Sequence, residues 1–140
     1  MKRLAMGLLV AAAAGCASTG DGGPRPSRNE ITLAEIEGTP AARTAQDVIN
    51  RLRPQWLRGR GSGTFNQTAE EGIIVYVDGM RSGYLPVTQL AERRQSAGPN
   101  PLEGITANRI YRILYYTASD ATQKYGTGHA FGAIEVITRR

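Results

Sequence analysis

The sequence predicts an α+β fold, with a sheet of three or four strands and two or three short helices after a disordered N-terminal tether. Three observations support this prediction. Apolar residues recur at helical spacing over residues 41–52. Residues 73–77 are an unbroken apolar, mostly β-branched run, and residues 109–117 alternate between two faces as a strand does. The predicted elements follow the order helix, strand, strand, helix, strand, helix, strand, which is typical of a small α+β sandwich.

The N-terminus has the features of an export signal. Residues 1–3 supply a short positive segment, and residues 4–14 carry no charge. This apolar stretch is shorter than the roughly 20 residues that a transmembrane helix needs. We therefore expect residues 1–15 to be a cleavable signal peptide.

Cys16 follows the small residues Ala13-Ala14-Gly15. This segment resembles the lipobox of bacterial lipoproteins, although it lacks the leucine often found three positions before the cysteine. The resemblance implies that the Cys16 thiol carries diacylglycerol, so that acyl chains such as palmitate anchor the protein in a membrane. Cys16 is the only cysteine, so no internal disulfide explains it. The alternative is an ordinary secretory signal, cut at an Ala-x-Ala-like site, with Cys16 incidental.

Ala17, rather than an aspartate, follows the cysteine. Under the sorting rule of some bacteria, this implies an anchor in the outer membrane, and we expect the domain to face the periplasm. Residues 16–29 are rich in Gly, Ser and Pro and are expected to be a flexible tether. Residues 30–140 are then long enough for one domain.

The charge of the chain is weakly basic. The sequence holds 17 basic and 12 acidic residues, and removal of Lys2 and Arg3 with the signal would leave 15 basic ones. Aromatic residues are not interleaved with the arginines in a stacking platform, so nucleic acid is not an expected partner. We expect most arginines on a solvated surface, with some near anionic headgroups.

The first half of the domain is predicted to contain one helix. Residues 31–36 are a short amphipathic lead-in, either a strand or a turn of helix. Thr39-Pro40 predicts an N-cap followed by proline at the first helical position. Pro54 is expected to end this helix, and Trp56 just beyond it is expected to pack back on the core.

A β-hairpin is predicted next. The strand over residues 73–77 is expected to be covered on both faces. Asp78-Gly79 follows directly and favours a tight turn, because glycine adopts positive φ at little cost. Residues 80–85 are the expected return strand. Residues 58–71, before this hairpin, are expected to be a loop. Residues 87–94, after it, are expected to form a brief helix, and residues 95–103 a second loop.

The C-terminal part is predicted to contain two further strands and a short helix. Strict alternation places two sets of side chains on opposite faces of the strand: Ile110, Arg112, Leu114 and Tyr116 on one, and Tyr111, Ile113 and Tyr115 on the other. Ser119 is expected to cap a helix through Lys124, with the last strand over residues 133–138. The residues expected to form structural turns are Asp78, Gly79, Gly126, Gly128 and Gly132.

Three segments, in this order, resemble the plug domain of TonB-dependent outer-membrane receptors. They are Asp47-Val48-Ile49 through Arg53-Pro54, Ile74-Val75-Tyr76-Val77-Asp78-Gly79-Met80-Arg81, and Ile110 to Arg140 with Asp120-Ala121-Thr122-Gln123-Lys124-Tyr125-Gly126 inside it. They are similar to the family's early helix with its proline exit, its V-x-V-D-G-V strand and turn, and its closing D-A-[ST]-x-x-Y-G and G-x-I-x-[VI]-x-T-[RK] patterns. The resemblance implies the α+β fold of a plug. The chain stops where the family's barrel begins, so we expect a stand-alone plug-like module and not a receptor.

No pattern for catalysis or metal binding is found. The stretch 126–132 is rich in glycine, but Phe131 stands where a nucleotide-binding loop needs its third glycine. His129 is the only histidine, and a zinc site or hydrolytic triad around it is not expected. Glu70-Glu71 lacks metal-ligand spacing and is expected to be solvated. The sequence therefore predicts no enzyme activity, no cofactor and no metal.

Tyrosines and arginines near the predicted third strand suggest a binding patch, although core packing explains most of the tyrosines. The candidate residues are Tyr111, Tyr115, Arg109, Arg112 and Arg81. Two functions remain open. The first is a lipid-anchored interaction or assembly module that docks on another envelope protein, for instance through a sheet edge. The second is an accessory lipoprotein that captures a small solute for an outer-membrane transporter, in a pocket lined by residues 58–71 and 95–103.

Overall fold

The computed structural model describes residues 27–58, 72–86 and 99–139. Several predicted features lie outside these residues: the signal segment 1–15, Cys16, the tether up to residue 26, Glu70-Glu71 and the brief helix over 87–94.

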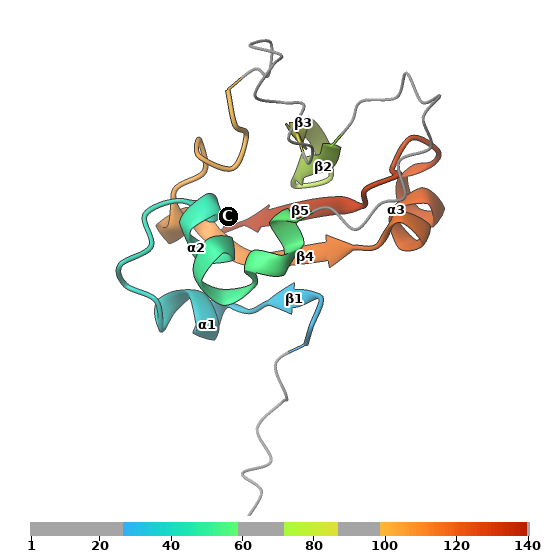
Figure 1. The fold of residues 1–140 in the computed structure, drawn as a ribbon. Coiled ribbons are helices and arrows are strands. Elements are labelled where there is room, and N and C mark those ends of the chain that lie inside the picture. The colour runs from blue at the N-terminus through green and yellow to red at the C-terminus, as the bar shows by residue number, and fades with distance from the viewer. Residues whose placement is uncertain (1–26, 59–71, 87–98, 140) are drawn as a thin grey trace, which may run out of the picture.

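The described chain forms one mixed sheet of five strands in the order β1-β4-β5-β2-β3 (Figure 1). Its elements are β1 (Glu30–Ile31), α1 (Leu33–Glu37), α2 (Ala45–Leu52), η1 (Pro54–Leu57), β2 (Gly72–Val77), β3 (Met80–Pro86), η3 (Ala107–Arg109), β4 (Ile110–Tyr116), α3 (Ala118–Tyr125) and β5 (Ala133–Thr138). The predicted α+β class is confirmed. The sheet has one strand more than expected, because Glu30–Ile31 pairs with β4; the lead-in over residues 31–36, which the sequence left open as strand or helix, begins as this strand and continues as α1.

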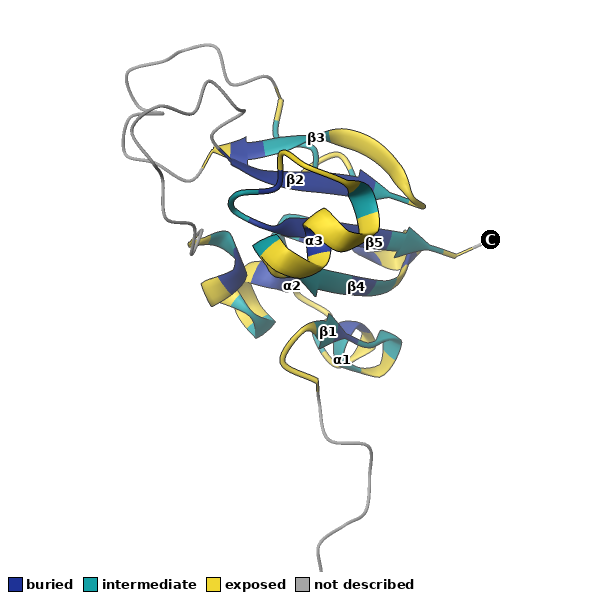
Figure 2. Cartoon of the chain, turned by 90° about the vertical axis from the view of Figure 1, so that its right-hand side faces the viewer, coloured by how far each residue is buried: buried dark blue, intermediate teal, exposed yellow. Residues whose placement is uncertain are grey.

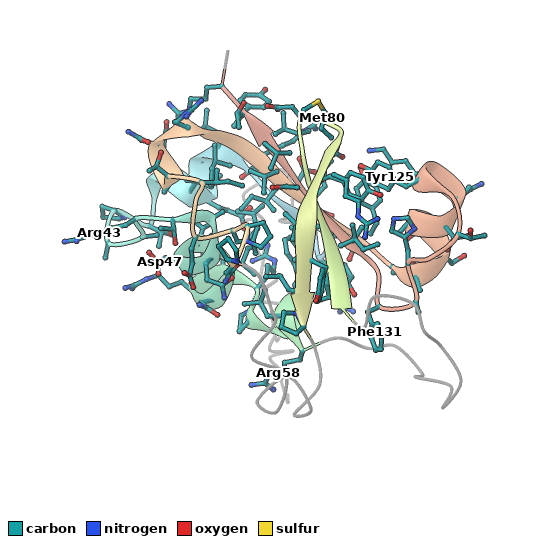
Figure 3. The ribbon with its side chains drawn as sticks, turned by 90° about the horizontal axis from the view of Figure 1, so that it is seen from above. Arg43, Asp47, Arg58, Met80, Tyr125 and Phe131 are labelled. Atoms are coloured by element: carbon teal, nitrogen blue, oxygen red, sulfur yellow. The ribbon has the colours of Figure 1, made fainter. Side chains whose placement is uncertain are left out.

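Two unequal layers cover the sheet. The helices α1, α2 and η1 lie on one face, and α3 lies on the other (Figure 1). Figure 3 places Arg43 and Asp47 on one side of the sheet and Tyr125 of α3 on the opposite side. We call these the α2 face and the α3 face.

Helix α2 begins at Ala45 because Thr44 and Asp47 form a capping box. The Thr44 hydroxyl accepts a hydrogen bond from the Asp47 N–H at 3.2 Å, and the Asp47 carboxylate accepts from the Thr44 N–H at 3.1 Å. Hydrogen bonds from the Arg43 and Thr44 backbone lower the pKa of Asp47. The prediction that Thr39-Pro40 starts this helix was wrong. The Thr39 hydroxyl instead donates to the Glu35 carbonyl at 2.9 Å and closes the end of α1.

The predicted hairpin is confirmed. Asp78 and Gly79 have φ of 50° and 81°, which is the pairing that a tight turn with right-handed strand twist requires. The Asp78 carboxylate accepts hydrogen bonds from the backbone N–H and the hydroxyl of Thr138, at 2.9 and 2.6 Å. These bonds tie the turn to β5, which pairs in parallel with β2 and antiparallel with β4.

β2 is covered on both faces, as predicted. Ile73 and Val75 pack in the large cluster of the α2 face, while Ile74 and Tyr76 pack under α3. Trp56 is also buried against the large cluster, as expected.

β4 does not follow the strict alternation that its sequence suggests. The register shifts between Ile110 and Arg112, which leaves Tyr111 as an inserted residue. Ile110 therefore packs on the α2 face together with Ile113, and the prediction that Ile110 shares a face with Arg112 was wrong.

Helix α3 begins two residues earlier than predicted. Thr117, and not Ser119, is its N-cap, and the Thr117 hydroxyl accepts from the Asp120 N–H at 3.3 Å. Gly126 ends the helix, as expected, with φ of 93°. Gly128 and Gly132 also have positive φ, of 99° and 84°. A Cβ on Gly132 would lie 2.4 Å from the Tyr116 carbonyl oxygen, so only glycine fits there.

Candidate functional site

Helix α3 rests on the sheet through a small apolar cluster and a polar network beside it. The cluster consists of Ile74, Tyr76, Ala121 and Ala133. Its aromatic part is a close stack: the rings of Tyr76 and Tyr125 lie 3.8 Å apart with 8° between their planes. α3 is thus held by a few contacts over the end of β4 and the start of β5.

The polar network joins α3 to β4 and β5. The Lys124 ammonium donates to Glu135 at 2.7 Å and to the Tyr116 hydroxyl at 2.6 Å, and that hydroxyl donates to Glu135 at 2.9 Å. Burial alone would raise the pKa of Glu135, but the hydrogen bonds from Lys124 and Tyr116 outweigh it and lower the pKa. For Lys124, burial would lower the pKa, but the bonds to Glu135 and Tyr116 raise it.

His129 is buried beside the stacked rings of Tyr76 and Tyr125, and its two ring nitrogens have different partners. Its Nδ1 lies 2.8 Å from the Gly126 carbonyl oxygen, which only accepts, so Nδ1 carries the proton. In the neutral ring, Nε2 then accepts a hydrogen bond from the Tyr76 hydroxyl, at 2.8 Å. These two contacts hold the loop between α3 and β5 against β2 and the end of α3.

The pKa shifts of Lys124, Glu135, Tyr76 and Tyr125 keep each of these four groups in one protonation state near neutral pH. Burial raises the pKa of Tyr125 to about 12 and also raises that of Tyr76. The buried Tyr125 hydroxyl has no hydrogen bond of acceptable geometry, although Lys124 and Glu135 lie close to it. With a charged lysine, an ionised glutamate and neutral tyrosines, these groups suit the docking of α3 better than general acid–base catalysis. The prediction that the chain is not an enzyme stays a prediction.

The α3 face is only half covered. Beyond α3, toward the β2–β3 turn and the start of β4, no helix of the described residues lies over the sheet (Figure 2). An open depression of about 670 Å³ lies there. We call it the Tyr111 surface; its lining residues are Asp78, Gly79, Tyr111, Glu135, Ile137, Thr138 and Arg139.

The charged side chains of the Tyr111 surface already have partners. Asp78 accepts from Thr138, Glu135 binds Lys124, and Arg139 binds Glu37 at 3.0 Å. What the surface offers to solvent is the Tyr111 ring, 50% exposed, beside the half-buried Ile137. An apolar centre inside a satisfied polar frame is the composition of a protein-interface core with its rim.

The predicted patch is not brought together as a whole. Arg109 and Arg112 flank Tyr111 on the chain, and the Arg109 carbonyl accepts from the Arg139 N–H at 2.7 Å. Tyr115, however, lies on the α2 face, where it stacks on Trp56 at 5.5 Å. Arg81 lies on β3, three strands from β4, which is about 14 Å at the usual strand spacing.

A second concavity was missed from the sequence. It has a volume of about 450 Å³ and lies on the α2 side, with Arg28, Asn29, Gln55, Trp56 and Tyr115 as its lining residues. We call it the Trp56 groove. The one signal for it in the sequence is the single tryptophan directly after a helix; besides its neighbour Gln55, the other lining residues come from two distant segments.

The described residues hold neither a metal-binding cluster nor a membrane-spanning helix. No group of three or more His, Cys, Asp or Glu side chains lies close enough there to hold a metal ion. Among the same residues, no helix has both the length and the apolar character needed to cross a membrane.

Comparison with known proteins gives no relative for this chain. No protein-family model, no curated protein and no solved structure matches it.

Proposed function

We propose that this chain is a lipid-anchored cell-envelope protein whose plug-like domain acts as a protein-interaction or assembly module. The observation that carries the proposal is the Tyr111 surface, an open half of a sheet face whose centre is an exposed tyrosine. Large exposed apolar side chains beside a satisfied polar rim are typical of a docking surface.

The face of the sheet is a better docking route than its edge. Within the described residues, no strand pairs with the outer side of β3. However, β3 carries an irregular register opposite Val75 and Tyr76, and it ends in Pro86. Bulges and proline are features by which proteins protect an edge strand from pairing. A partner that covers Tyr111 and Ile137 avoids this obstacle.

The partner that fits is a protein segment with an apolar side chain over Tyr111 and a carboxylate beside it. Arg109 is exposed, and its guanidinium makes no ion pair with any described residue. Arg112 has only a 3.5 Å pair with Glu30, and its side chain is 44% exposed. These two arginines favour an acidic rim on the partner.

The proposed anchor would hold this module close to a membrane. From Cys16 to Glu30 the chain can span at most about 50 Å, even if fully extended. The same proposal includes lipidation of Cys16, which would anchor the protein in the outer membrane with the domain facing the periplasm. It is supported by the sequence pattern before Cys16.

The anchor is tested by intact mass and membrane fractionation of the wild-type chain beside Cys16→Ser, both expressed in a bacterial host. The expected result is a wild-type protein that begins at Cys16, carries added acyl mass and sediments with membranes. The variant is expected to stay soluble or uncleaved. Equal masses and equal fractionation of the two proteins would rule the anchor out.

The docking surface is tested in the same host with a photo-crosslinking amino acid at position 111. A matched control carries the same photo-crosslinking amino acid in place of Gln123. Gln123 is exposed on α3 and is not a lining residue of the Tyr111 surface. The expected result is one discrete protein adduct at 111 that weakens when Arg109→Glu is added. Adducts of equal pattern at both positions, or none at 111, would remove the Tyr111 surface from the proposal.

A further inference from the structure

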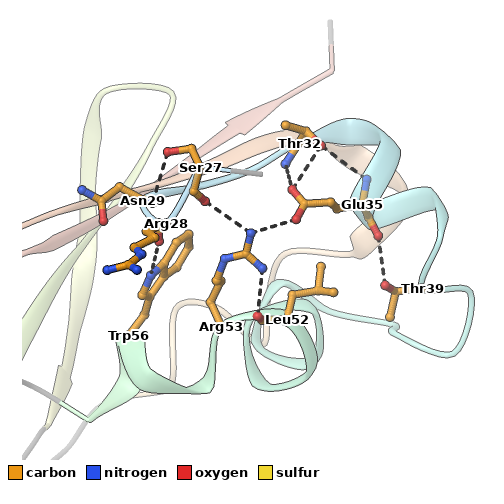
Figure 4. A network of polar contacts seen from close by, with 9 residues as sticks. All are labelled: Ser27, Arg28, Asn29, Thr32, Glu35, Thr39, Leu52, Arg53 and Trp56. Atoms are coloured by element: carbon orange, nitrogen blue, oxygen red, sulfur yellow. Dashed lines mark hydrogen bonds and ion pairs between the residues drawn. The ribbon is translucent and has the colours of Figure 1, made fainter. Parts of the chain in front are cut away.

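The Trp56 groove has a rigid aromatic floor. Trp56 and Tyr115 stack with 5.5 Å between ring centroids and 17° between planes. The Trp56 indole N–H donates to the Arg28 carbonyl at 3.1 Å (Figure 4), and the Tyr115 N–H donates to the Asn29 carbonyl at 2.9 Å. Trp56 is almost completely buried, so the partly exposed Tyr115 is the accessible part of the floor, and Trp56 holds it from behind.

The rim of the groove is polar, and no side chain of the described residues pairs with it. Arg28, Asn29 and Gln55 are all exposed. The backbone of each takes part in structure, but none of the three side chains makes a hydrogen bond or an ion pair with a described residue. One guanidinium and two amides therefore line the groove with donors, and the amides also with acceptors, that no described residue engages.

The geometry points to a binding site for a short saccharide that carries N-acetyl groups. The C–H groups of a pyranose ring bear partial positive charge and pack on the negative face of an aromatic ring, which Tyr115 supplies. Asparagine and glutamine amides can donate to and accept from sugar hydroxyls, and they pair with an N-acetyl amide in both directions. The volume of about 450 Å³ is in the range of small-molecule sites and fits one or two sugar rings.

Other ligand classes fit this groove less well. A lipid chain needs an apolar lining, whereas a guanidinium and two amides line this groove beside its two rings. A simple anion would use Arg28 but leave the aromatic floor without a role. The site lies on the α2 face, whereas the Tyr111 surface lies on the α3 face, so this inference does not rest on the proposed docking function.

The test uses the fluorescence of Trp56, which is the only tryptophan in the chain. Triacetylchitotriose is titrated into the purified full chain, kept in a detergent without a sugar headgroup. We expect a saturable change in tryptophan emission. The double variant Asn29→Ala/Gln55→Ala is expected to lower the affinity at least about tenfold, as for the loss of two buried hydrogen bonds.

A matched control carries the same substitutions elsewhere. Asn108 and Gln123 are exposed and outside the groove, and Asn108→Ala/Gln123→Ala is expected to bind as the wild type does. Both double variants remove only exposed side chains, so both proteins are expected to fold. The inference is overturned if the wild type shows no saturable response at millimolar sugar, or if both double variants bind equally. A response to maltotriose as strong as that to triacetylchitotriose would overturn the N-acetyl assignment.

Discussion

The two faces of the sheet are held by different forces. On the α2 face, sixteen buried residues form one continuous apolar cluster under α1, α2 and η1. On the α3 face, the apolar cluster has four buried residues, and a lysine, a glutamate, a histidine and stacked tyrosines do the rest of the docking. The α2 face therefore carries most of the stability, because a large buried apolar area stabilises the fold more than a few polar contacts do. The α3 face is the one with room left for a partner.

The first way to test this contrast is to remove the same side chain from each face. Ile113→Ala on the α2 face is expected to cost about 2–5 kcal/mol, because a fully buried isoleucine leaves a cavity in a continuous cluster. Ile74→Ala is expected to fall near the low end, at about 2 kcal/mol, because α3 can settle into the space. Denaturant unfolding measures both. A larger loss for Ile74→Ala would reverse the ranking of the two faces.

The next expected effect concerns the polar docking of α3. Glu135→Gln is expected to cost about 1–3 kcal/mol at neutral pH, because it weakens charged hydrogen bonds to Lys124 and Tyr116 at a buried position. Glu103→Gln, at an exposed glutamate, is the control and is expected to change stability by less than about 0.5 kcal/mol.

The pH dependence of that difference has a defined sign. The folded state lowers the pKa of Glu135 below its ordinary 4.5. Its stabilising contribution is therefore complete above pH 4.5 and is lost as the pH falls through the lower, folded-state pKa. The gap in unfolding free energy between wild type and Glu135→Gln should shrink below pH 4.5. Glu35 and Asp47 also have lowered pKa values, but both proteins contain them. Their contributions therefore cancel in the difference between the two unfolding free energies. A gap that widens in acid contradicts this account.

A smaller effect is expected at the start of α3. Thr117→Ala removes the N-cap and should cost about 1 kcal/mol. Ser119→Ala, two residues along, should change stability by less than about 0.5 kcal/mol, since the Ser119 hydroxyl caps nothing. Thermal or denaturant unfolding of the two variants decides which residue is the cap. Equal losses would restore the sequence-based assignment.

The two wrong N-cap predictions, at Thr39 and Ser119, show which local pattern determines where a helix begins. Thr32, Thr44 and Thr117 each cap a helix, and each is followed three residues later by Glu35, Asp47 or Asp120. A threonine with an acidic residue at that spacing can satisfy two backbone donors at once, which Thr39-Pro40 and Ser119 cannot. The helix starts were therefore predictable, but by this pattern and not by proline or by a lone serine.

The interior strands β2 and β5 were easier to predict than the short edge strand β1 and the inserted residue of β4. β2 is an unbroken apolar run that packs on both faces, and β5 is rich in β-branched residues, of which Ile134 and Val136 pack on the α2 face, so their own sequence identifies them. β1 is only Glu30–Ile31 and exists because it pairs with Leu114 and Ile113, more than eighty residues later. The insertion of Tyr111 into β4 likewise depends on the partner strand.

The candidate site was predictable only in part for the same reason. Tyr111, Arg109 and Arg112 are neighbours on the chain, and proximity in sequence places them together. Tyr115 was assigned to the same side as Tyr111 by strict alternation, and the inserted residue separates the two. The Trp56 groove combines residues 28–29, 55–56 and 115, which are brought together only by the β1–β4 pairing and the return of η1.

The smallest expected effect on stability is also the sharpest test of the contrast between the faces. Tyr111 is half exposed, so Tyr111→Ala should change the unfolding free energy by less than about 0.5 kcal/mol. If the open half of the α3 face serves docking, the same substitution should abolish the crosslinked adduct formed from a probe at Arg109. Met80→Ala is the matched control: Met80 is 75% exposed, more than Tyr111, and lies outside the Tyr111 surface. Loss of the adduct with Met80→Ala as well would mean that exposed apolar area in general, and not this surface, captures the partner. Retention with Met80→Ala and loss with Tyr111→Ala assigns the contact to the part of the sheet that α3 leaves open.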